Sequence, residues 1–398
     1  SEIIVNQQPR QLYNLGDVIN LPVIILSLPE LSGTVNMDLI CGTQSINFYK
    51  SDVYSSNGER KIESSLILKK STIKELIGNC KIRIRLNDEP PVVTNNFKIS
   101  NTMSVVKTSA QSEFNPGEDL FLQGNVLKEN GNGANGFINV TLITENSSIN
   151  YVDVINTGTF SVNLSLPKDM KTGAYLVKLF AYETDLDGTL TNNGFSDFNI
   201  IVKQVPTNLE IIFENQEIEP GTTMKVKAIL HDQTGESMPS KVYLTIKNED
   251  DKILEQLEKN TDEFLEFPTL YNEPPVTWKI VAASNKIMSE SFFKIKAKEK
   301  VRVEIANKTI IIKNIGNVPY NNSVLVKVGI KSVPIDISLA VDETKKFLMS
   351  APDGGYNIEV KTSEGDLVTG MVSLTGKQIN VTEISERIID FIRNPVVW

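Results

Sequence analysis

The chain contains an internal repeat with a period of about one hundred residues. The segment from Gly33 to Tyr49 aligns without a gap to the segment from Gly136 to Val152, and seven of the seventeen positions are identical. A unit of this length can enclose a hydrophobic core of its own, unlike one turn of a solenoid. The repeat therefore predicts successive small domains built on one plan.

A glycine turn recurs with the same period. Gly16, Gly117 and Gly221 each follow a short apolar strand and precede a strand of alternating polarity. Pro116 and Pro220 stand directly before two of these glycines, and Pro-Gly fills the centre of a type II turn. The turn chemistry therefore repeats together with the hydrophobic pattern.

A strand of alternating polarity recurs late in each unit. The four copies are Gly78 to Leu86, Gly173 to Ala181, Val276 to Ala283 and Gly354 to Lys361. In the first copy, a period of two residues places Cys80, Ile82, Ile84 and Leu86 on one face. Short half-buried strands joined by Gly, Asn and Asp turns are typical of antiparallel sandwiches with Greek-key connections.

The predicted fold class is all-β, with four tandem immunoglobulin-like β-sandwiches and a short C-terminal helix. The expected sandwiches cover residues 1–102, 103–204, 205–298 and 299–377, and the expected tail covers residues 378–398. The last strand of one unit runs almost directly into the first strand of the next. Linkers this short favour a semi-rigid rod over freely rotating domains.

The tail departs from the β pattern. Apolar residues recur there at helical spacing: Ile384, Ile388, Ile389, Phe391 and Ile392. Thr382 and Glu383 suit a helix start, and Asn394-Pro395 ends the pattern. Because the sequence ends on two valines and Trp398, we expect a single-pass membrane anchor to follow. The alternative is a terminal helix docked on the fourth sandwich.

Composition excludes several function classes. The net charge of −9 and the pI near 5.0 provide no basic field, so nucleic acid and anionic lipid are poor partners. A single histidine, His231, removes most metal sites and most Ser–His or Cys–His catalytic arrangements. No nucleotide-binding, zinc or nucleophile-elbow motif occurs. We expect no enzyme and no cofactor, although a carboxylate-only site of the glycosidase type stays open.

Two segments invite comparison with known families. The run from Lys313 to Gly329, followed by Gly354 to Lys361, resembles the cell-adhesion-related Ig-like domains of bacterial and archaeal surface proteins. The middle units, with their Pro-Gly turns and the run from Leu166 to Leu179, resemble macroglobulin-type domains of large extracellular proteins. The resemblance implies an extracellular, non-catalytic scaffold. It implies no functional residue.

The two cysteines fall on inward positions of two strands that antiparallel pairing would bring together. We expect a disulfide between Cys41 and Cys80, which would place the chain in an oxidising compartment. The alternative is two buried thiols. Cys41 and Gln44 also have the spacing of a macroglobulin thioester, but the repeat aligns them with Thr144 to Ser147, at a strand end rather than a helix start.

An acidic loop between Glu183 and Asn193 carries alternating oxygen donors. Asp185, Asp187, Thr189 and Asn192 resemble part of a calcium loop, but the final bidentate Glu of an EF-hand is missing. A plain hairpin turn rich in Asp and Gly is therefore the favoured interpretation, and a calcium site is the alternative.

An aromatic pair lies on the strand before that loop. Leu176, Lys178, Phe180 and Tyr182 share its outward face, which is more apolar than a solvated face requires. Packing of Phe180 and Tyr182 against a neighbouring domain is the favoured interpretation. The alternative is that this exposed aromatic pair stacks on a sugar ring or docks a partner strand.

Six Asn-x-Ser/Thr sequons permit glycosylation in a secreted protein. They begin at Asn139, Asn146, Asn163, Asn307, Asn321 and Asn380.

The function that these observations favour is a cell-surface or secreted scaffold with a structural or adhesive role. Its partner would be a protein or a surface glycan, and strand addition at an exposed sheet edge would allow self-association. There are two alternatives. The chain could be a binding module of a larger secreted assembly, or it could form accessory domains of an enzyme encoded elsewhere.

Overall fold

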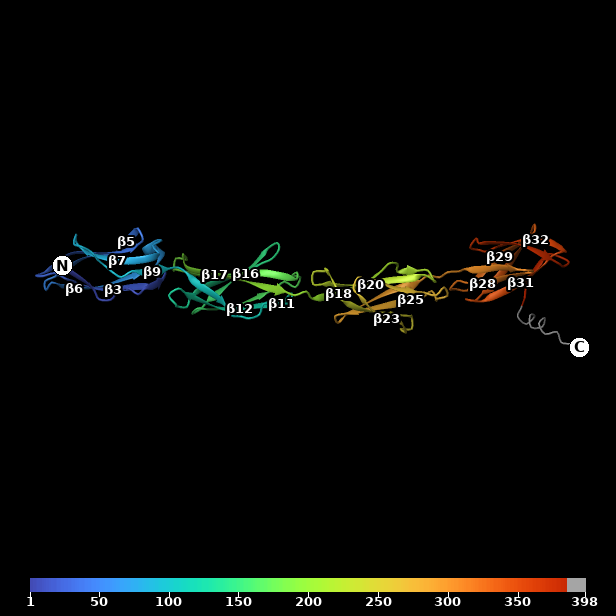
Figure 1. Ribbon diagram of the computed structural model, residues 1–398, viewed down its shortest axis with the longest axis horizontal. Helices are drawn as coiled ribbons and strands as arrows, with labels where there is room; N and C mark the ends of the chain where they lie inside the picture. Colours follow the sequence, from blue (N-terminus) through green and yellow to red (C-terminus); the bar gives the residue numbers. More distant parts are fainter. Residues whose placement is uncertain (385–398) are drawn as a thin grey trace. The chain divides into compact units, whose positions relative to one another are not determined.

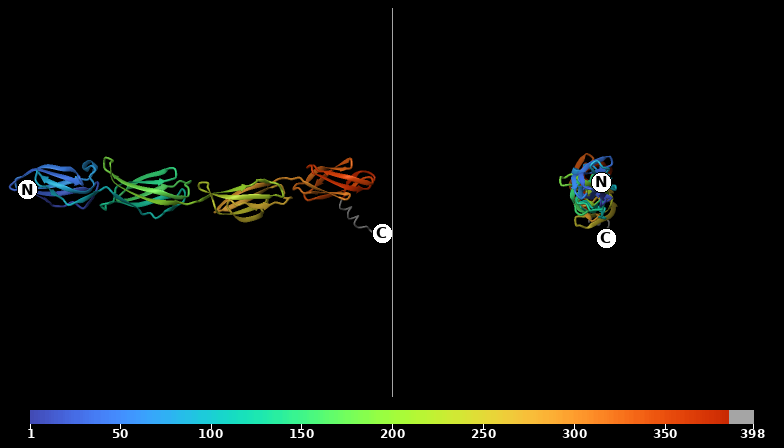
Figure 2. Two further views of the ribbon diagram at one scale, coloured as in Figure 1. Left: turned by 45° about the horizontal axis from the view of Figure 1, so that its top comes forward. Right: turned by 90° about the vertical axis from the view of Figure 1, so that its left-hand side faces the viewer.

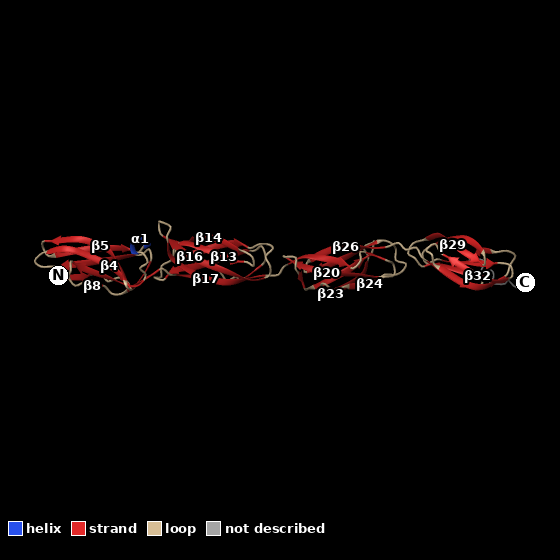
Figure 3. Ribbon diagram, turned by 90° about the horizontal axis from the view of Figure 1, so that it is seen from above, coloured by secondary structure: helices blue, strands red, loops and turns tan. Residues whose placement is uncertain are grey.

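The computed structural model describes residues 1–384. In this range it contains thirty-four strands and one four-residue helix, α1 (Lys70–Ile73) (Figure 3). The all-β prediction is therefore confirmed. The chain divides into two compact units, Ser1–Val205 and a second that begins at Pro206. Figure 1 labels strands along the chain, coloured from blue at the N-terminus to red in the last strands.

The first unit begins with a three-stranded and a six-stranded sheet, in the orders β1-β3-β6 and β2-β9-β7-β4-β5, with β8 paired to β7. The strands are β1 (Glu2–Val5), β2 (Leu12–Asn14), β3 (Val18–Leu26), β4 (Leu31–Cys41), β5 (Gln44–Ser55), β6 (Glu59–Ile67), β7 (Gly78–Leu86), β8 (Val92–Val93) and β9 (Phe97–Ser100). Alternate residues of both sheets enter one hydrophobic cluster, in which Ile25, Leu39 and Ile82 are fully buried.

Two further sheets complete the first unit, in the orders β10-β12-β15 and β11-β17-β16-β13-β14. The strands are β10 (Met103–Lys107), β11 (Glu113–Phe114), β12 (Asp119–Lys128), β13 (Gly136–Ile143), β14 (Ser148–Ile155), β15 (Thr159–Ser165), β16 (Gly173–Thr184) and β17 (Leu190–Val202). A second cluster lies between them, with Leu122, Val140 and Val177 at its centre. The long strands of each sheet run alongside one another (Figure 2).

The second unit starts with two sheets. One has the strand order β18-β20-β21, with β24 paired to β20, and the other has the order β19-β26-β25-β22-β23. The strands are β18 (Pro206–Phe213), β19 (Glu217–Ile218), β20 (Thr223–Asp232), β21 (Ser237–Met238), β22 (Lys241–Lys247), β23 (Ile253–Asn260), β24 (Leu265–Pro268), β25 (Thr277–Ser284) and β26 (Ile287–Ile295). Trp278 and Phe293 stack edge to face in their shared cluster, with ring centroids 5.6 Å apart.

The last two sheets have the orders β27-β28-β31-β34 and β30-β29-β32-β33. The strands are β27 (Val301–Ala306), β28 (Thr309–Asn314), β29 (Tyr320–Val328), β30 (Lys331–Leu339), β31 (Thr344–Ser350), β32 (Gly354–Lys361), β33 (Leu367–Leu374) and β34 (Asn380–Glu383). They enclose a fourth cluster that includes the fully buried ring of Tyr320.

The sequence repeat corresponds to one hairpin that occurs twice. Leu39 of β4 pairs with Ile46 of β5, and the aligned residues Leu142 of β13 and Ile149 of β14 form the same antiparallel pair. The identical positions therefore have the same place in the ladder, and their side chains fill equivalent parts of two cores.

The glycine turns also have one structural role. In three of the sheet pairs, the short strand before the turn (β2, β11 or β19) pairs in parallel with the last strand of that sheet pair (β9, β17 or β26). The chain then crosses to the other sheet. Gly16, Gly117 and Gly221 have φ values of 94°, 76° and 80°, in the region that favours glycine and that a type II turn requires.

The tail differs from our expectation at its start. We expected residues from 378 onward to leave the β-structure, and Thr382 and Glu383 to begin a helix. Instead Thr382 and Glu383 belong to β34, which pairs with Leu348 and Phe347 of β31. The open edge of β31 accepts four more residues of chain, and this tertiary contact overrides the local helix signal. The expected helical positions after Ile384 lie outside the described residues.

Candidate functional site

Four aromatic side chains form a row on the outer face of the β11-β17-β16-β13-β14 sheet. Phe195 lies on β17 opposite Phe180 of β16, and Phe137 lies on β13 opposite Tyr182 of β16. Ring centroids are 4.7 Å apart for Phe180 and Phe195, 5.3 Å for Phe180 and Tyr182, and 5.5 Å for Tyr182 and Phe137. The two aromatic residues that we expected to face outward are thus half-buried between two others. We call these four residues the aromatic row.

The aromatic row extends into an apolar patch at the sheet edge. Phe195 is 74% exposed, and Val152 and Val154 of the edge strand β14 are 53% and 59% exposed. Val154 lies opposite Phe137 in the ladder, so the apolar surface continues across four strands. A contiguous apolar patch on an outer sheet face is typical of an interaction surface.

Polar groups border this patch. Lys178 and Asp197 are opposite each other in the next row of the ladder. Asn139 lies between Phe180 and Val152, and its Oδ1 atom is buried without a hydrogen-bond partner among the described residues. Asn139 is half-buried, whereas the other five sequon asparagines are exposed. The exposed five are Asn146, Asn163, Asn307, Asn321 and Asn380.

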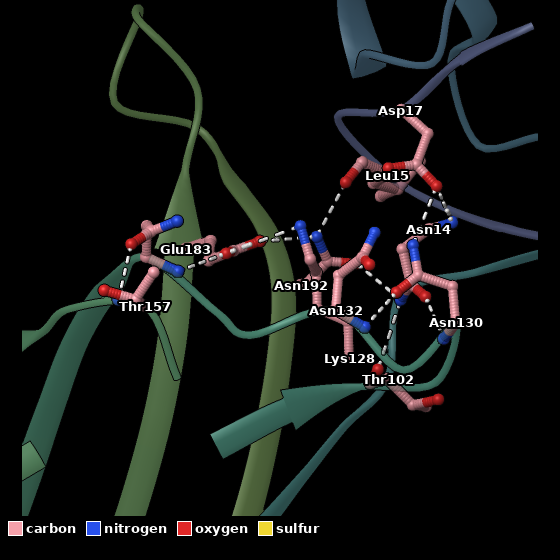
Figure 4. A network of polar contacts seen from close by, with 11 residues as sticks. Asn14, Leu15, Asp17, Thr102, Lys128, Asn130, Asn132, Thr157, Glu183 and Asn192 are labelled. Atoms are coloured by element: carbon pink, nitrogen blue, oxygen red, sulfur yellow. Dashed lines mark hydrogen bonds and ion pairs between the residues drawn. The ribbon is translucent and has the colours of Figure 1, made fainter. Parts of the chain in front are cut away.

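A buried polar network joins the two sheet pairs of the first unit (Figure 4). Asn14 is the last residue of β2, and its Nδ2 atom donates to Oδ1 of Asn192 on β17 at 3.1 Å and to the carbonyl of Thr102 at 3.2 Å. Asn192 donates from Nδ2 to the carbonyl of Leu15 at 2.7 Å and to Glu183 at 2.7 Å. Both asparagines have no exposed surface. We call this set of contacts the joint network.

Further residues complete the joint network. The backbone N–H of Asn130 donates to Oδ1 of Asn14 at 2.9 Å, and Nδ2 of Asn130 donates to Asp17 at 2.8 Å. Glu183 accepts from the backbone N–H of Asn135 at 2.7 Å, and Nζ of Lys128 lies 3.8 Å from it. Sequence reasoning missed this network, although a run of asparagines around position 130 was a visible signal.

A second group of contacts lies beside the joint network. The Glu129 carboxylate forms an ion pair with Lys98 and accepts hydrogen bonds from the hydroxyls of Ser100 and Thr102. These three partners stabilise the charged form, and they lower the Glu129 pKa from 4.5 to about 2. Glu129 thereby connects the end of the first sheet pair to the second.

The acidic loop does not gather its oxygens around one point. The Asp185 carboxylate accepts the backbone N–H groups of Asp187 and Thr189 at 3.0 Å and 2.9 Å, which closes a local turn. Asn192 is directed instead into the joint network. Among residues 1–384 no group of three or more His, Cys, Asp or Glu side chains is arranged to hold a metal ion.

The structure joins the two cysteines. Cys41 at the end of β4 lies opposite Cys80 on β7, and the sulfurs form a disulfide with an S–S distance of 2.00 Å. The Cys41 sulfur is therefore occupied, and Gln44 is exposed at the start of β5. This arrangement contradicts a thioester between Cys41 and Gln44.

No protein-family model and no curated protein sequence matches the chain. Among solved structures it is similar to a mutant of Salmonella alpha-2-macroglobulin, with 12% identity over 91% of this chain and 32% of that chain and a TM-score of 0.23. It is also similar to trypsin-activated alpha-2-macroglobulin from Escherichia coli, with 12% identity over 90% and 32% of the two chains and a TM-score of 0.21. The chain spans about a third of the length of these structures.

None of the helical structure within residues 1–384 is long and apolar enough to cross a bilayer.

Proposed function

We propose that the chain is a non-catalytic scaffold of four immunoglobulin-like domains, which acts outside the cell and presents the aromatic row to a protein partner. The observation that carries the proposal is the apolar patch on the outer face of β16 and its neighbours. Exposing Phe195 and two valines to water costs free energy that burial against a partner would recover, at about 25 cal/mol per Å² of apolar surface.

Two features support a scaffold that holds this patch in place. The row lies on long paired strands rather than on a loop, so its side chains keep fixed positions. The joint network fixes the sheet pair that carries it against the preceding one. The Cys41–Cys80 bond supports an extracellular location, because disulfides persist mainly in oxidising compartments.

The ring geometry favours a protein partner over a sugar. A pyranose stacks on an open aromatic face, but Phe180 and Tyr182 lie against each other and against the outer two rings. Only Phe195 is widely exposed. A partner strand or loop can pack on ring edges and on the valines of β14, so it can use the whole patch.

Photo-crosslinking tests the proposal. A benzoylphenylalanine replaces Phe195 in the full chain, and a control chain carries it at Phe121, which is 47% exposed on the opposite sheet. We expect illumination on the producing cells to give a discrete protein adduct from position 195 and none from position 121. Equal labelling at both positions, or labelling of a glycan alone, would contradict the proposal.

A further inference from the structure

A pocket of about 520 Å³ lies in the second unit, near the start of β27. Four cationic side chains line it, from Lys298, Lys300, Arg302 and Lys313, together with Tyr271. No carboxylate is among its lining residues. This concentration of positive charge is local, because the whole chain has a net charge of −9. We call it the basic pocket.

Two adjacent strands bring these cations together. Arg302 lies in β27, Lys298 and Lys300 lie in the segment directly before it, and all three line the pocket. Arg302 lies directly opposite Lys313 in the antiparallel ladder of β27 and β28. Like charges at opposite positions of a ladder repel each other and destabilise the pair.

Little on the protein itself offsets this repulsion. Lys313 has one carboxylate partner, Asp342, at 3.8 Å. Among the described residues, Lys298, Lys300 and Arg302 have no ion-pair partner. Hydrogen bonds from Tyr271 and Asn272 lower the pKa of Asp342, so this carboxylate stays charged and offsets one of the four cations. The pocket therefore keeps an excess of positive charge.

The backbone that carries these cations is held by a turn. Asn317 accepts the Lys298 N–H on Oδ1 at 2.7 Å, and its Nδ2 atom donates to the carbonyls of Lys296 and Glu273, each at 2.8 Å. Gly316 packs so closely that a Cβ atom there would lie 2.1 Å from the Lys298 carbonyl oxygen. The Asn-x-Gly-Asn turn of residues 314–317 thus fixes the wall of the pocket before any ligand arrives.

We propose that the basic pocket binds a multivalent oxyanion, a phosphate or sulfate group that several of the four cations contact together. An oxyanion at this place would relieve the repulsion between Arg302 and Lys313. It would also accept charge-assisted hydrogen bonds from the guanidinium and the ammonium groups. The pocket volume lies in the range of small-ligand sites. This inference is independent of the aromatic row.

Titration calorimetry with inorganic pyrophosphate tests the pocket on the full chain at low ionic strength. The test variant is Arg302→Gln with Lys313→Gln, and the control is Lys331→Gln with Lys361→Gln, two exposed lysines outside the pocket. Both variants change the net charge equally. We expect the affinity to fall by about tenfold or more in the test variant and to stay within about twofold in the control.

Thermal unfolding separates binding from folding. Because the test variant removes a like-charge pair, we expect it to be at least as stable as the parent chain without ligand, while pyrophosphate raises the parent's Tm more than the variant's. Titrations with inorganic sulfate and with a sulfated oligosaccharide distinguish a free anion from a sulfate group carried on a sugar chain. Binding of either supports the site. Equal affinity of the test and control variants, or no binding of any of these anions at about 10 mM, would overturn the proposal.

Discussion

Asn14 and Asn192 are 178 positions apart in the chain, yet their side-chain amides form a buried hydrogen bond of 3.1 Å. Neither side chain has exposed surface. The Nδ2 atom of Asn192 donates its two hydrogen bonds to the Leu15 carbonyl and to the Glu183 carboxylate. Buried amides are costly to leave unpaired, so the two sheet pairs of the first unit resist any rotation that would break this contact.

Replacing Asn192 with alanine should therefore destabilise the first unit. The substitution removes one hydrogen-bond partner each from the buried Asn14 amide, the Leu15 carbonyl and Glu183, and we expect a loss of about 1–3 kcal/mol in the free energy of unfolding. Urea unfolding, monitored through the hydrogen exchange of backbone amides in β2 and β17, measures the effect. The control is the neighbouring Asn193, whose side chain forms no hydrogen bond among the described residues. Asn193→Ala should lower the free energy of unfolding by less than about 0.5 kcal/mol. Equal losses in the two variants would show that the joint network contributes no specific stability.

Stability should depend on pH through Glu129. Its pKa is about 2 in the folded chain, against 4.5 for an ordinary glutamate, so the charged carboxylate stabilises the folded state above pH 4.5. This contribution should be lost as the pH falls toward 2. Unfolding of the parent chain and of Glu129→Gln between pH 7 and about pH 2 measures it. We expect the difference between them to shrink on acidification, and a constant difference would contradict the assigned pKa.

The disulfide gives a prediction for the mass and the stability of the first unit. The intact chain should gain about 2 Da on reduction, because two thiols replace the bond between Cys41 and Cys80. The bond closes a loop with a sequence separation of 39, and the chain-entropy relation gives about 4 kcal/mol for such a loop. We expect Cys41→Ser with Cys80→Ser to lower the free energy of unfolding by up to that amount. An unchanged mass on reduction would exclude the bond.

Gly316 should not tolerate a side chain. In Gly316→Ala the added Cβ atom would lie 2.1 Å from the Lys298 carbonyl oxygen, so the turn or the β27 segment must shift. We expect a cost of about 1–3 kcal/mol in thermal or urea unfolding of the second unit. Gly355→Ala is the matched control, because no heavy atom lies within 4 Å of its added Cβ. A Gly316→Ala variant as stable as this control would refute the close approach.

The sequence predicted the β-hairpins well and the polar contacts poorly. The aligned repeat located two equivalent hairpins, since Leu39 and Leu142 occupy the same ladder position. In contrast, the sequence placed Asn192 among the oxygen donors of an acidic loop, whereas the structure buries its side chain against Asn14. Period-two patterns report which face of a strand is buried, but they contain no information about which distant polar group will meet a given side chain.

The same limit applies to charge. The composition indicated an acidic protein with no basic field, yet Arg302 and Lys313 are brought opposite each other by the pairing of β27 with β28. Net charge is a sum over the whole chain, while electrostatic recognition depends on which few charges the fold places together.

The amino-acid sequence alone determined that this chain forms repeated β-hairpins with alternating cores and glycine turns, because these features follow from local periodicity and backbone sterics. Only the tertiary structure decided that four rings form one row, that Asn14 meets Asn192, and that four cations share a pocket. Those contacts join residues on different strands, so they depend on strand pairing and sheet packing rather than on any local pattern.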